Sequence, residues 1–327
     1  MASMSPAERI QLCDQVAADK RMLGPPLDTV HRIDASLRTN WGMALAPSHD
    51  ELDSAIKKAA SPSLYRKYRS LHDEQASYLT FDQAIPEDVE TAFYDVIADP
   101  RISGLIHSQK RAMILDAGCL LVHLARALRI EGPALDIGCN SGYHAAAMAA
   151  ETGMRVHGVD VSTKAIAEAK RLTASLPGLA FDQAPLDAPE LQGAFEMVYA
   201  VRSIDLTPAF AVTLAGLLQP GGVAVVVPPN PPDTDKRTID AIAGSGLGFA
   251  FSDIVGGWQG EGRGFEAGFT AVFVRGGDRP MPSDVIDQAQ CGWNQHFKGY
   301  ANDPKTPHHE KTQAYCRGHW QAANSSG

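Results

Sequence analysis

The sequence of 327 residues has no long hydrophobic run and few cysteines. No apolar stretch reaches the ~18 to 20 residues that cross a bilayer. The N-terminal stretch MASMSPAERIQLCDQVAADKRMLG also lacks the apolar segment of a secretory signal. The five cysteines are scattered and odd in number, which fits free thiols in a reducing compartment better than a disulfide framework. These absences predict a cytoplasmic protein with no membrane-spanning segment.

An excess of basic residues is also missing. The 29 Lys and Arg against 38 Asp and Glu give a net charge of −9, so no overall basic field attracts nucleic acid or an anionic membrane. Apolar residues make up 44% and charged residues 20% of the chain, an ordinary globular mixture. A nucleic-acid substrate is therefore disfavoured, and the length allows one enlarged domain or two.

The spacing of apolar residues divides the chain into three parts. Residues 1–111 are polar, with helical spacing interrupted by prolines, and predict a helical N-terminal cap. Residues 112–277 alternate short apolar runs with helix-length segments, which predicts an α/β domain with a parallel sheet between helices. Residues 278–327 form an aromatic- and His-rich C-terminal extension without a clear period.

Seven strands and five helices are predicted from residue 112 onward. The strand candidates lie within 133–138, 155–161, 178–183, 195–201, 222–228, 249–258 and 268–276. The helix candidates are 112–128, 143–151, 163–175, 207–218 and 234–245.

The stretch ALDIGCNSGYHAAAMAA, which begins at residue 134, predicts a ligand site. A strand that enters a small-residue turn and then a helix presents unpaired amides to a ligand. Asn140 stands where many such loops have glycine, and asparagine tolerates a left-handed backbone. Asp160 ends the next strand, ~20 residues on, where a carboxylate could accept hydrogen bonds from ribose hydroxyls.

Asp136 distinguishes two classes of nucleoside ligand. A dinucleotide site requires the spacing G-x-G-x-x-G, whereas this loop reads G-C-N-S-G-Y. A carboxylate two residues before Gly138 would repel phosphate yet suit a cationic ligand with a free amino group. This favours S-adenosylmethionine over NAD.

Five motifs in order resemble those of the class I S-adenosylmethionine-dependent methyltransferases. They are LDIGCNSG, GVDVS, PLDAPEL, FEMVYAV and LLQPGGVAVVV, and the resemblance covers roughly residues 112–275. It implies a Rossmann-like fold whose seven-stranded, mostly parallel sheet has helices on both faces. It also implies a transferase activity with S-adenosylmethionine as the cofactor. Glu196, where the family usually has Asp, is a minor departure.

The same resemblance implies a set of cofactor contacts at the strand ends. They are Asp136 for the methionine amino group; Gly138, Asn140 and Gly142 for the loop beneath the cofactor; Asp160 for the ribose; Val161, Asp187 and Ala188 for the adenine; and Ala200 with Val201 for the path to the substrate. The alternative for each of the three acids is a helix cap or a turn.

Arg202 and Asp205 are candidates for acceptor chemistry. They follow the fourth strand in AVRSIDL, which differs from the N-P-P-Y sequences of enzymes that methylate base amines. The arginine could bind a carboxylate and the aspartate could accept a proton. The alternative for Asp205 is the N-cap of the next helix, with Thr207 as a rival cap.

Further candidates come from the two ends of the chain. His296 is a possible base because its pKa range suits proton transfer, and Trp293, Tyr65 and Tyr78 could line the acceptor pocket. Packing is the alternative for these aromatics. The tail holds several Cys and His residues but only one C-x-x-H pair, so no metal is expected.

The sequence thus predicts a methyltransferase that acts on a small molecule. The acceptor would carry an amine, hydroxyl or acid, with N- or O-methylation in a specialised biosynthetic pathway. Two alternatives stay open: an RNA-modifying enzyme, especially one acting on tRNA, and a non-catalytic cofactor-binding protein with the same fold. The acceptor and the oligomeric state are not set by the sequence.

Overall fold

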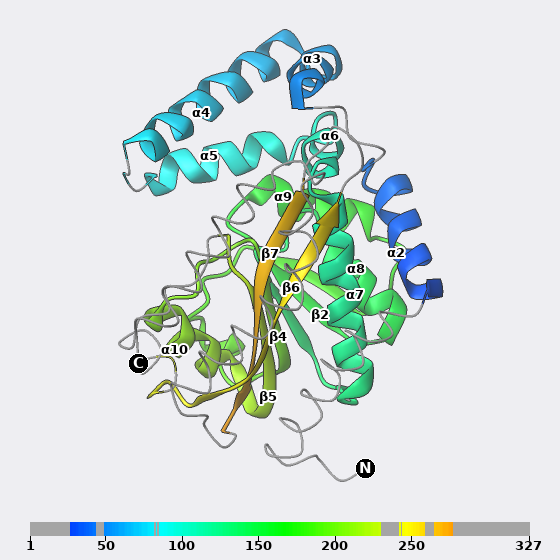
Figure 1. The fold of residues 1–327 in the computed structure, drawn as a ribbon, viewed down its shortest axis with the longest axis vertical. Coiled ribbons are helices and arrows are strands. Elements are labelled where there is room, and N and C mark those ends of the chain that lie inside the picture. Colours follow the sequence, from blue (N-terminus) through cyan, green and yellow to red (C-terminus); the bar gives the residue numbers. More distant parts are fainter. Residues whose placement is uncertain are drawn as a thin grey trace, which may run out of the picture.

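A seven-stranded sheet flanked by helices forms the body of the protein, and a smaller group of helices lies at one end (Figure 1). The computed structural model describes residues 27–43, 49–81, 83, 85–229, 242, 244–258 and 265–276. The predicted α/β fold class is confirmed within these residues.

The sheet has the order β3-β2-β1-β4-β5-β7-β6. Its strands are β1 Ala134–Ile137, β2 Val156–Val159, β3 Leu179–Asp182, β4 Phe195–Val201, β5 Leu218–Val227, β6 Leu247–Trp258 and β7 Phe265–Arg275. Neighbouring strands from β3 to β5 are parallel, and β7 runs antiparallel to both of its neighbours. All seven predicted strands are present. β5 begins before the predicted residue 222, because Leu218 already pairs with Phe195, and the register shifts before Met197 pairs with Val223.

Nine α-helices fall within the described residues. They are α2 Leu27–Thr39, α3 His49–Ala59, α4 Pro62–Thr80, α5 Glu87–Ile97, α6 Ser103–Ser108, α7 Arg111–Ala127, α8 Tyr143–Thr152, α9 Thr163–Leu172 and α10 Pro208–Leu217. Four of the predicted helices correspond to α7 to α10. Most of the predicted helix 234–245, and the whole extension from residue 278, lie outside the described residues. No described helix is both long and apolar enough to span a membrane.

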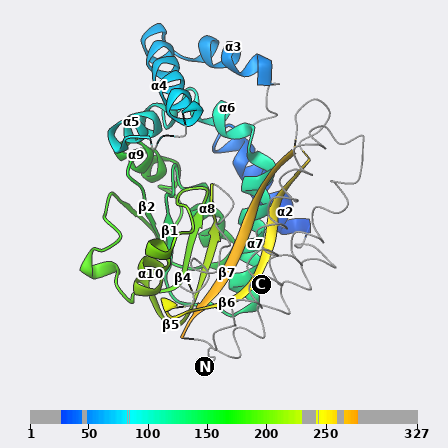
Figure 2. The same cartoon turned by 60° about the vertical axis from the view of Figure 1, so that its left-hand side comes forward.

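The central strands β1, β4 and β5 are buried on both faces, as their continuous apolar runs indicated. Side chains such as Met197 and Tyr199 share one core cluster with α2, α7 and α8. Their strand neighbours, such as Val198 and Leu135, pack with α10 on the opposite face. Figure 2 shows α10 and α7 on opposite sides of the sheet.

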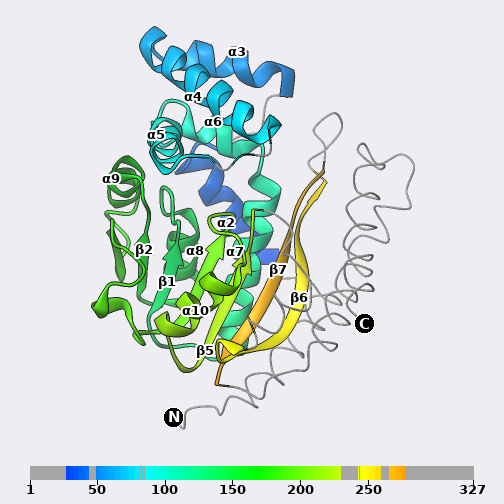
Figure 3. The ribbon, with the colours of Figure 1, turned by 90° about the vertical axis from the view of Figure 1, so that its left-hand side faces the viewer.

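Helices α3, α4 and α5, which we call the cap, have a small core of their own. Ile56, Tyr68, Val96, Ile97 and Ile102 are its buried members. The cap lies beyond the carboxyl ends of the parallel strands, with α5 close to α9 (Figure 3). The ligand sites of parallel α/β sheets form at this edge.

Helix α2 belongs to the body rather than to the cap. Its residues Ile33 and Leu37 pack into the main core beside α7. The chain leaves the body after Gly42 and returns to it at Gly104, and the backbones at these two points are in contact. A Cβ atom on Gly104 would lie 2.6 Å from the Trp41 carbonyl oxygen and 2.7 Å from that of Gly42. The sequence boundary at residue 111 stays a prediction.

Candidate active site

The turn between β1 and α8, which we call the Gly loop, has the predicted left-handed residues. Gly138, Asn140 and Gly142 have φ values of 68°, 49° and 81°. A Cβ atom on Gly138 would lie 2.2 Å from Ser203 Cβ, and one on Gly142 would lie 2.9 Å from Phe181 Cζ. The close approach that requires glycine therefore comes from the protein's own side chains.

Asp160 stabilises this loop from the end of β2. Its Oδ2 accepts a hydrogen bond from the Asn140 N–H (2.8 Å) and its Oδ1 accepts one from the Ser162 N–H (2.9 Å). A carboxylate has about four acceptor sites, so positions are left for ribose hydroxyls. Burial raises the pKa of Asp160, the two backbone donors lower it, and nearby Asp95 raises it further.

Asp136 is the most deeply buried acid of the site, with 2% of its surface exposed. Burial raises the pKa of this carboxyl group well above its usual value, and Asp160 adds to the rise. The Ala145 backbone, in the first turn of α8, and the Tyr199 side chain partly offset it. Among the described residues, Asp136 Oδ2 and Tyr199 Oη each lack a hydrogen-bond partner of good geometry. A buried carboxylate oxygen without a donor is costly, and a cationic ligand group would remove that cost.

The residues predicted to contact adenine lie around the ends of β2 and β3. Val161 is 53% exposed although it is apolar, which fits a surface that a ring could cover. Asp187 is exposed and Ala188 is buried. The Ala188 N–H already donates to the Pro185 carbonyl (3.1 Å), so a bond to adenine would have to be shared. Ala200 is fully buried near the end of β4.

Arg202 has an unusual backbone for a residue with a side chain. Its φ is 60°, a conformation that non-glycine residues adopt at a cost and often near functional sites. Its N–H donates to the Val227 carbonyl (2.6 Å) and its Nη1 to the Pro229 carbonyl (2.9 Å). Its Nε is buried without a partner among the described residues. The guanidinium group therefore keeps a donor that an acceptor molecule could use.

Thr207, and not Asp205, caps α10. Thr207 Oγ1 accepts a hydrogen bond from the Phe210 N–H (3.2 Å). The capping alternative for Asp205 is wrong, because the helix begins two residues later than that cap would require. Asp205 is exposed at the carboxyl edge of the sheet.

Two residues of α5 belong to this region and were not predicted from the sequence. Partial burial raises the pKa of Glu90, and Glu87 and Asp205 raise it further. Burial also raises the pKa of Tyr94, which is influenced by Glu90, Asp160 and Arg202. Glu90 and Tyr94 are four residues apart and so share one helix face. The sequence showed that face, but nothing in it showed which strand ends the face would meet.

The other predicted acceptor residues are not brought together with these. Tyr65 lies on α4, and its hydroxyl donates to Asp53 Oδ2 of α3 (2.6 Å). Tyr78 is near the end of α4, where its carbonyl accepts the N–H groups of Phe81 and Gln83. Their role in the acceptor pocket stays a prediction. Trp293 and His296 lie outside the described residues.

Trp41 is a further contact to the Gly loop that the sequence analysis missed. Its side chain is 7% exposed, and its Nε1 donates to the Ser141 carbonyl (2.9 Å). The segment after α2 thus holds the loop from beneath. No local pattern links these residues, which are 100 positions apart.

We expect Trp41→Phe to lower both the stability and the cofactor affinity. The substitution removes one buried hydrogen bond and some packing, at a cost of about 1 to 2 kcal/mol. Thermal unfolding and cofactor titration would measure the two effects. Ile33→Val is the control, since it trims a buried side chain of the same core without touching the loop, and it should leave binding unchanged. Equal binding by Trp41→Phe and wild type would contradict a role in the loop.

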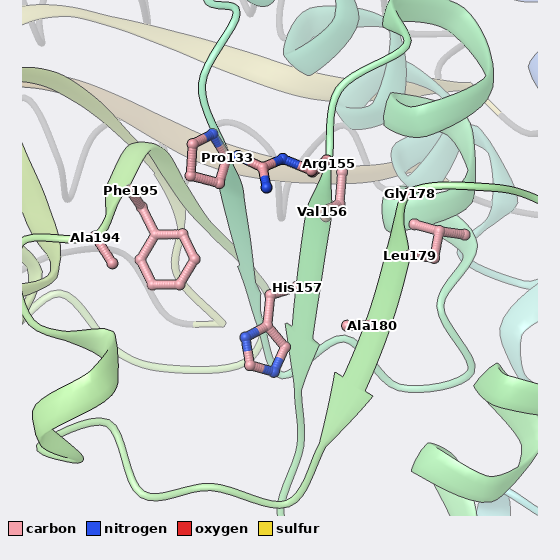
Figure 4. Close-up of a pocket in the computed structure, with 9 residues that line it drawn as sticks. All are labelled: Pro133, Arg155, Val156, His157, Gly178, Leu179, Ala180, Ala194 and Phe195. Atoms are coloured by element: carbon pink, nitrogen blue, oxygen red, sulfur yellow. The ribbon is translucent and has the colours of Figure 1, made fainter.

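A pocket of about 420 Å³ lies at the opposite edge of the sheet (Figure 4). Its lining includes Pro133, Arg155, Gly178 and Ala194, each of which immediately precedes one of the parallel strands. His157 also lines it. Because α/β sheets bind ligands at the carboxyl ends of their strands, this pocket is separate from the site around Asp160.

No cluster of three or more His, Cys, Asp or Glu residues suited to a metal occurs in the part of the chain that the structure describes. The Cys and His residues of the extension lie outside that part.

Comparison with known proteins identifies the class. Residues 134–222 match a family model described as a methyltransferase domain. No curated protein matches the chain. Among solved structures, magnesium protoporphyrin IX methyltransferase (ChlM) from Synechocystis PCC 6803 with bound S-adenosylmethionine is 18% identical, with 52% of this chain and 83% of that chain covered and a TM-score of 0.42.

A second similar structure is geranyl diphosphate C-methyltransferase from Streptomyces coelicolor A3(2) in complex with Mg²⁺, geranyl diphosphate and S-adenosyl-L-homocysteine. It is 16% identical, with 52% of this chain and 84% of that chain covered and a TM-score of 0.37. The family match and the strand order define a methyltransferase domain of the class I, Rossmann-like superfamily. The chain accordingly contains a methyltransferase domain, as the five motifs implied.

Proposed function

We propose that this methyltransferase acts on a small-molecule acceptor by N- or O-methylation, in the biosynthesis of a specialised metabolite. The observation that carries the proposal is the position of α5 over the carboxyl edge of the sheet, where Tyr94 comes close to Asp160 and Arg202. A helix at this place limits the size of an acceptor and excludes water, which small-molecule sites require.

The charge of the site supports a small molecule over RNA. Asp136, Asp160, Glu90 and Asp205 all lie around the strand ends, and a site lined with acids is poorly suited to a phosphate backbone. Arg202 lies near these acids and Tyr94. We therefore infer an acceptor with one anionic group for Arg202 and one amine or hydroxyl that receives the methyl group. A tRNA-modifying enzyme is the second candidate, and no observation favours it.

The cofactor residues in this proposal are those that the resemblance implied. Asp136 would hold the methionine ammonium group with its unpartnered oxygen, and Asp160 would hold the ribose. Val161 would cover the adenine, with Asp187 and Ala188 at its edge. The fit is supported by the donor set, because a buried acid beside a left-handed Gly loop suits a cationic nucleoside.

When bound, the cofactor supplies a methyl group that is already activated on a sulfonium. The protein then has to align the acceptor and take its proton. Arg202 would orient the acceptor, and Asp205 or its neighbour Glu90 would accept the proton as the new bond to carbon forms. The raised pKa of Glu90 favours the proton-bound form that such a transfer produces.

Titration of S-adenosylmethionine and S-adenosylhomocysteine tests the cofactor part. We expect Asp160→Ala to weaken binding by roughly 2 kcal/mol or more, as expected for lost charge-assisted hydrogen bonds. Asp182→Ala is the matched control, because Asp182 ends the neighbouring strand β3 and pairs with His157 and Lys170, whose side chains are not part of the Gly loop. No binding of either ligand by folded wild type would overturn the proposal.

A further inference from the structure

A chain of three hydrogen bonds connects cap helix α5 to the Gly loop. Asp95 Oδ1 accepts from Ser162 Oγ (2.6 Å). The Ser162 N–H donates to Asp160 Oδ1 (2.9 Å), and Asp160 Oδ2 accepts from the Asn140 N–H (2.8 Å). A carboxylate of the cap is thus linked through two residues to the backbone of the loop.

Ser162 is the central residue of this chain and is fully buried. Its hydroxyl accepts the Ala165 N–H (3.1 Å), which makes it the N-cap of α9. A hydroxyl group has one hydrogen to donate, and here Asp95 receives it. Without Asp95 that hydrogen would lose its acceptor inside the protein, which costs free energy. Asp95 therefore fixes the orientation of a group that also binds Asp160.

Several acidic groups surround Asp160, and they bear on the role of the Asp95–Ser162 hydrogen bond. Asp95 approaches from α5 and Asp136 from β1, and both are acids. Tyr94 of α5 and Tyr143 of α8 also face Asp160. Like charges repel, and the hydrogen bond from Ser162 to Asp95 opposes that repulsion by tying α5 to the segment beside Asp160. A ligand with positive charge would relieve that repulsion.

We propose that Asp95 is a positioning residue for cofactor binding, which holds Ser162, and through it Asp160 and the Gly loop, in the arrangement that the cofactor requires. The inference rests on the function proposed above. It assigns the cap a role in binding the cofactor, in addition to covering the acceptor.

The test is calorimetric titration of S-adenosylmethionine into the full chain over a range of pH. We expect Asp95→Ala to weaken binding about tenfold, the effect of one lost hydrogen bond to a charged group. Asp95→Asn keeps an oxygen acceptor for Ser162 and should lose less than about threefold. Because it removes a negative charge beside Asp160, the pKa of Asp160 should fall, and binding should persist to lower pH than in wild type.

Asp88→Asn is the matched control, since it makes the same charge change on the same face of α5, two turns away from Asp95, and should bind like wild type. Unchanged affinity in Asp95→Ala, even with lowered stability, would overturn the proposal. Should Asp95→Ala not fold, the pH dependence of cofactor affinity in Asp95→Asn decides. Binding that persists to lower pH than in wild type supports the proposal, and an unchanged pH dependence overturns it. If wild type itself bound no cofactor, the proposed function would fail, and this inference with it.

Discussion

Asp136→Asn is expected to abolish cofactor binding while it stabilises the protein without ligand. The affinity should fall by about 3 kcal/mol, more than 100-fold, because the ligand's ammonium group would lose its buried charge partner. The side chain keeps its shape, and its new amide could donate to the unpartnered Tyr199 hydroxyl. Titration calorimetry and thermal unfolding of the same samples would measure both effects.

The sign of the stability change follows from the pKa. Burial raises the pKa of Asp136 in the folded state, so the folded protein binds a proton more readily than the unfolded chain does. Wild type without ligand should therefore gain stability from this group as the pH falls toward that raised pKa. Asp136→Asn should lose this dependence and be more stable by about 1 to 3 kcal/mol at neutral pH, as expected when a buried unsatisfied atom is removed. A destabilised variant that still binds would contradict the assignment.

Gly138→Ala is expected to be among the most destabilising single changes in the domain. A methyl group there would meet Ser203 Cβ at 2.2 Å, and the backbone has a φ of 68°. Left-handed strain costs about 1 to 2 kcal/mol and overpacking about 1 to 3 kcal/mol, which together predict a loss of about 2 to 5 kcal/mol. Denaturant unfolding would measure it.

Gly153→Ala is the control for the backbone part of this loss. Gly153 ends α8 with a φ of 74°, but no atom lies within 4 Å of an added Cβ. Gly153→Ala should lower the free energy of unfolding only by the cost of the left-handed backbone, about 1 to 2 kcal/mol. Equal losses at the two glycines would show that Ser203 moves aside. Adding Ser203→Gly to Gly138→Ala should recover part of the difference, less the bond from Ser203 Oγ to the Ile137 carbonyl (2.7 Å).

The sheet could be predicted because its central strands are buried on both faces and read as unbroken apolar runs, as in FEMVYAV. The left-handed Asn140 could be predicted because few residue types tolerate that conformation. Helix spacing likewise showed that the N-terminal part would be helical. These features depend on residues that are close in the sequence.

The contacts between distant segments could not be predicted in the same way. Gly138 is constrained by Ser203, and Ser141 is held by Trp41. Glu196 was read as a minor departure, yet its carboxylate accepts the N–H groups of Glu131 (3.1 Å) and Gly132 (2.6 Å) before β1. Each pairing depends on how whole elements dock, and a periodic pattern gives the buried face of an element but not its partner.

The meeting of Gly42 and Gly104 has a consequence for how the cap relates to the rest of the chain. The helices between them leave the body and come back at one point, with a core of their own. In topological terms the cap is an insertion within a domain whose first described helix is α2. A different helical segment whose ends are equally close together could therefore replace the cap between those two glycines. The strands and α2 would then stay the same, while both the acceptor that reaches them and the support that Asp95 gives to the Gly loop would change.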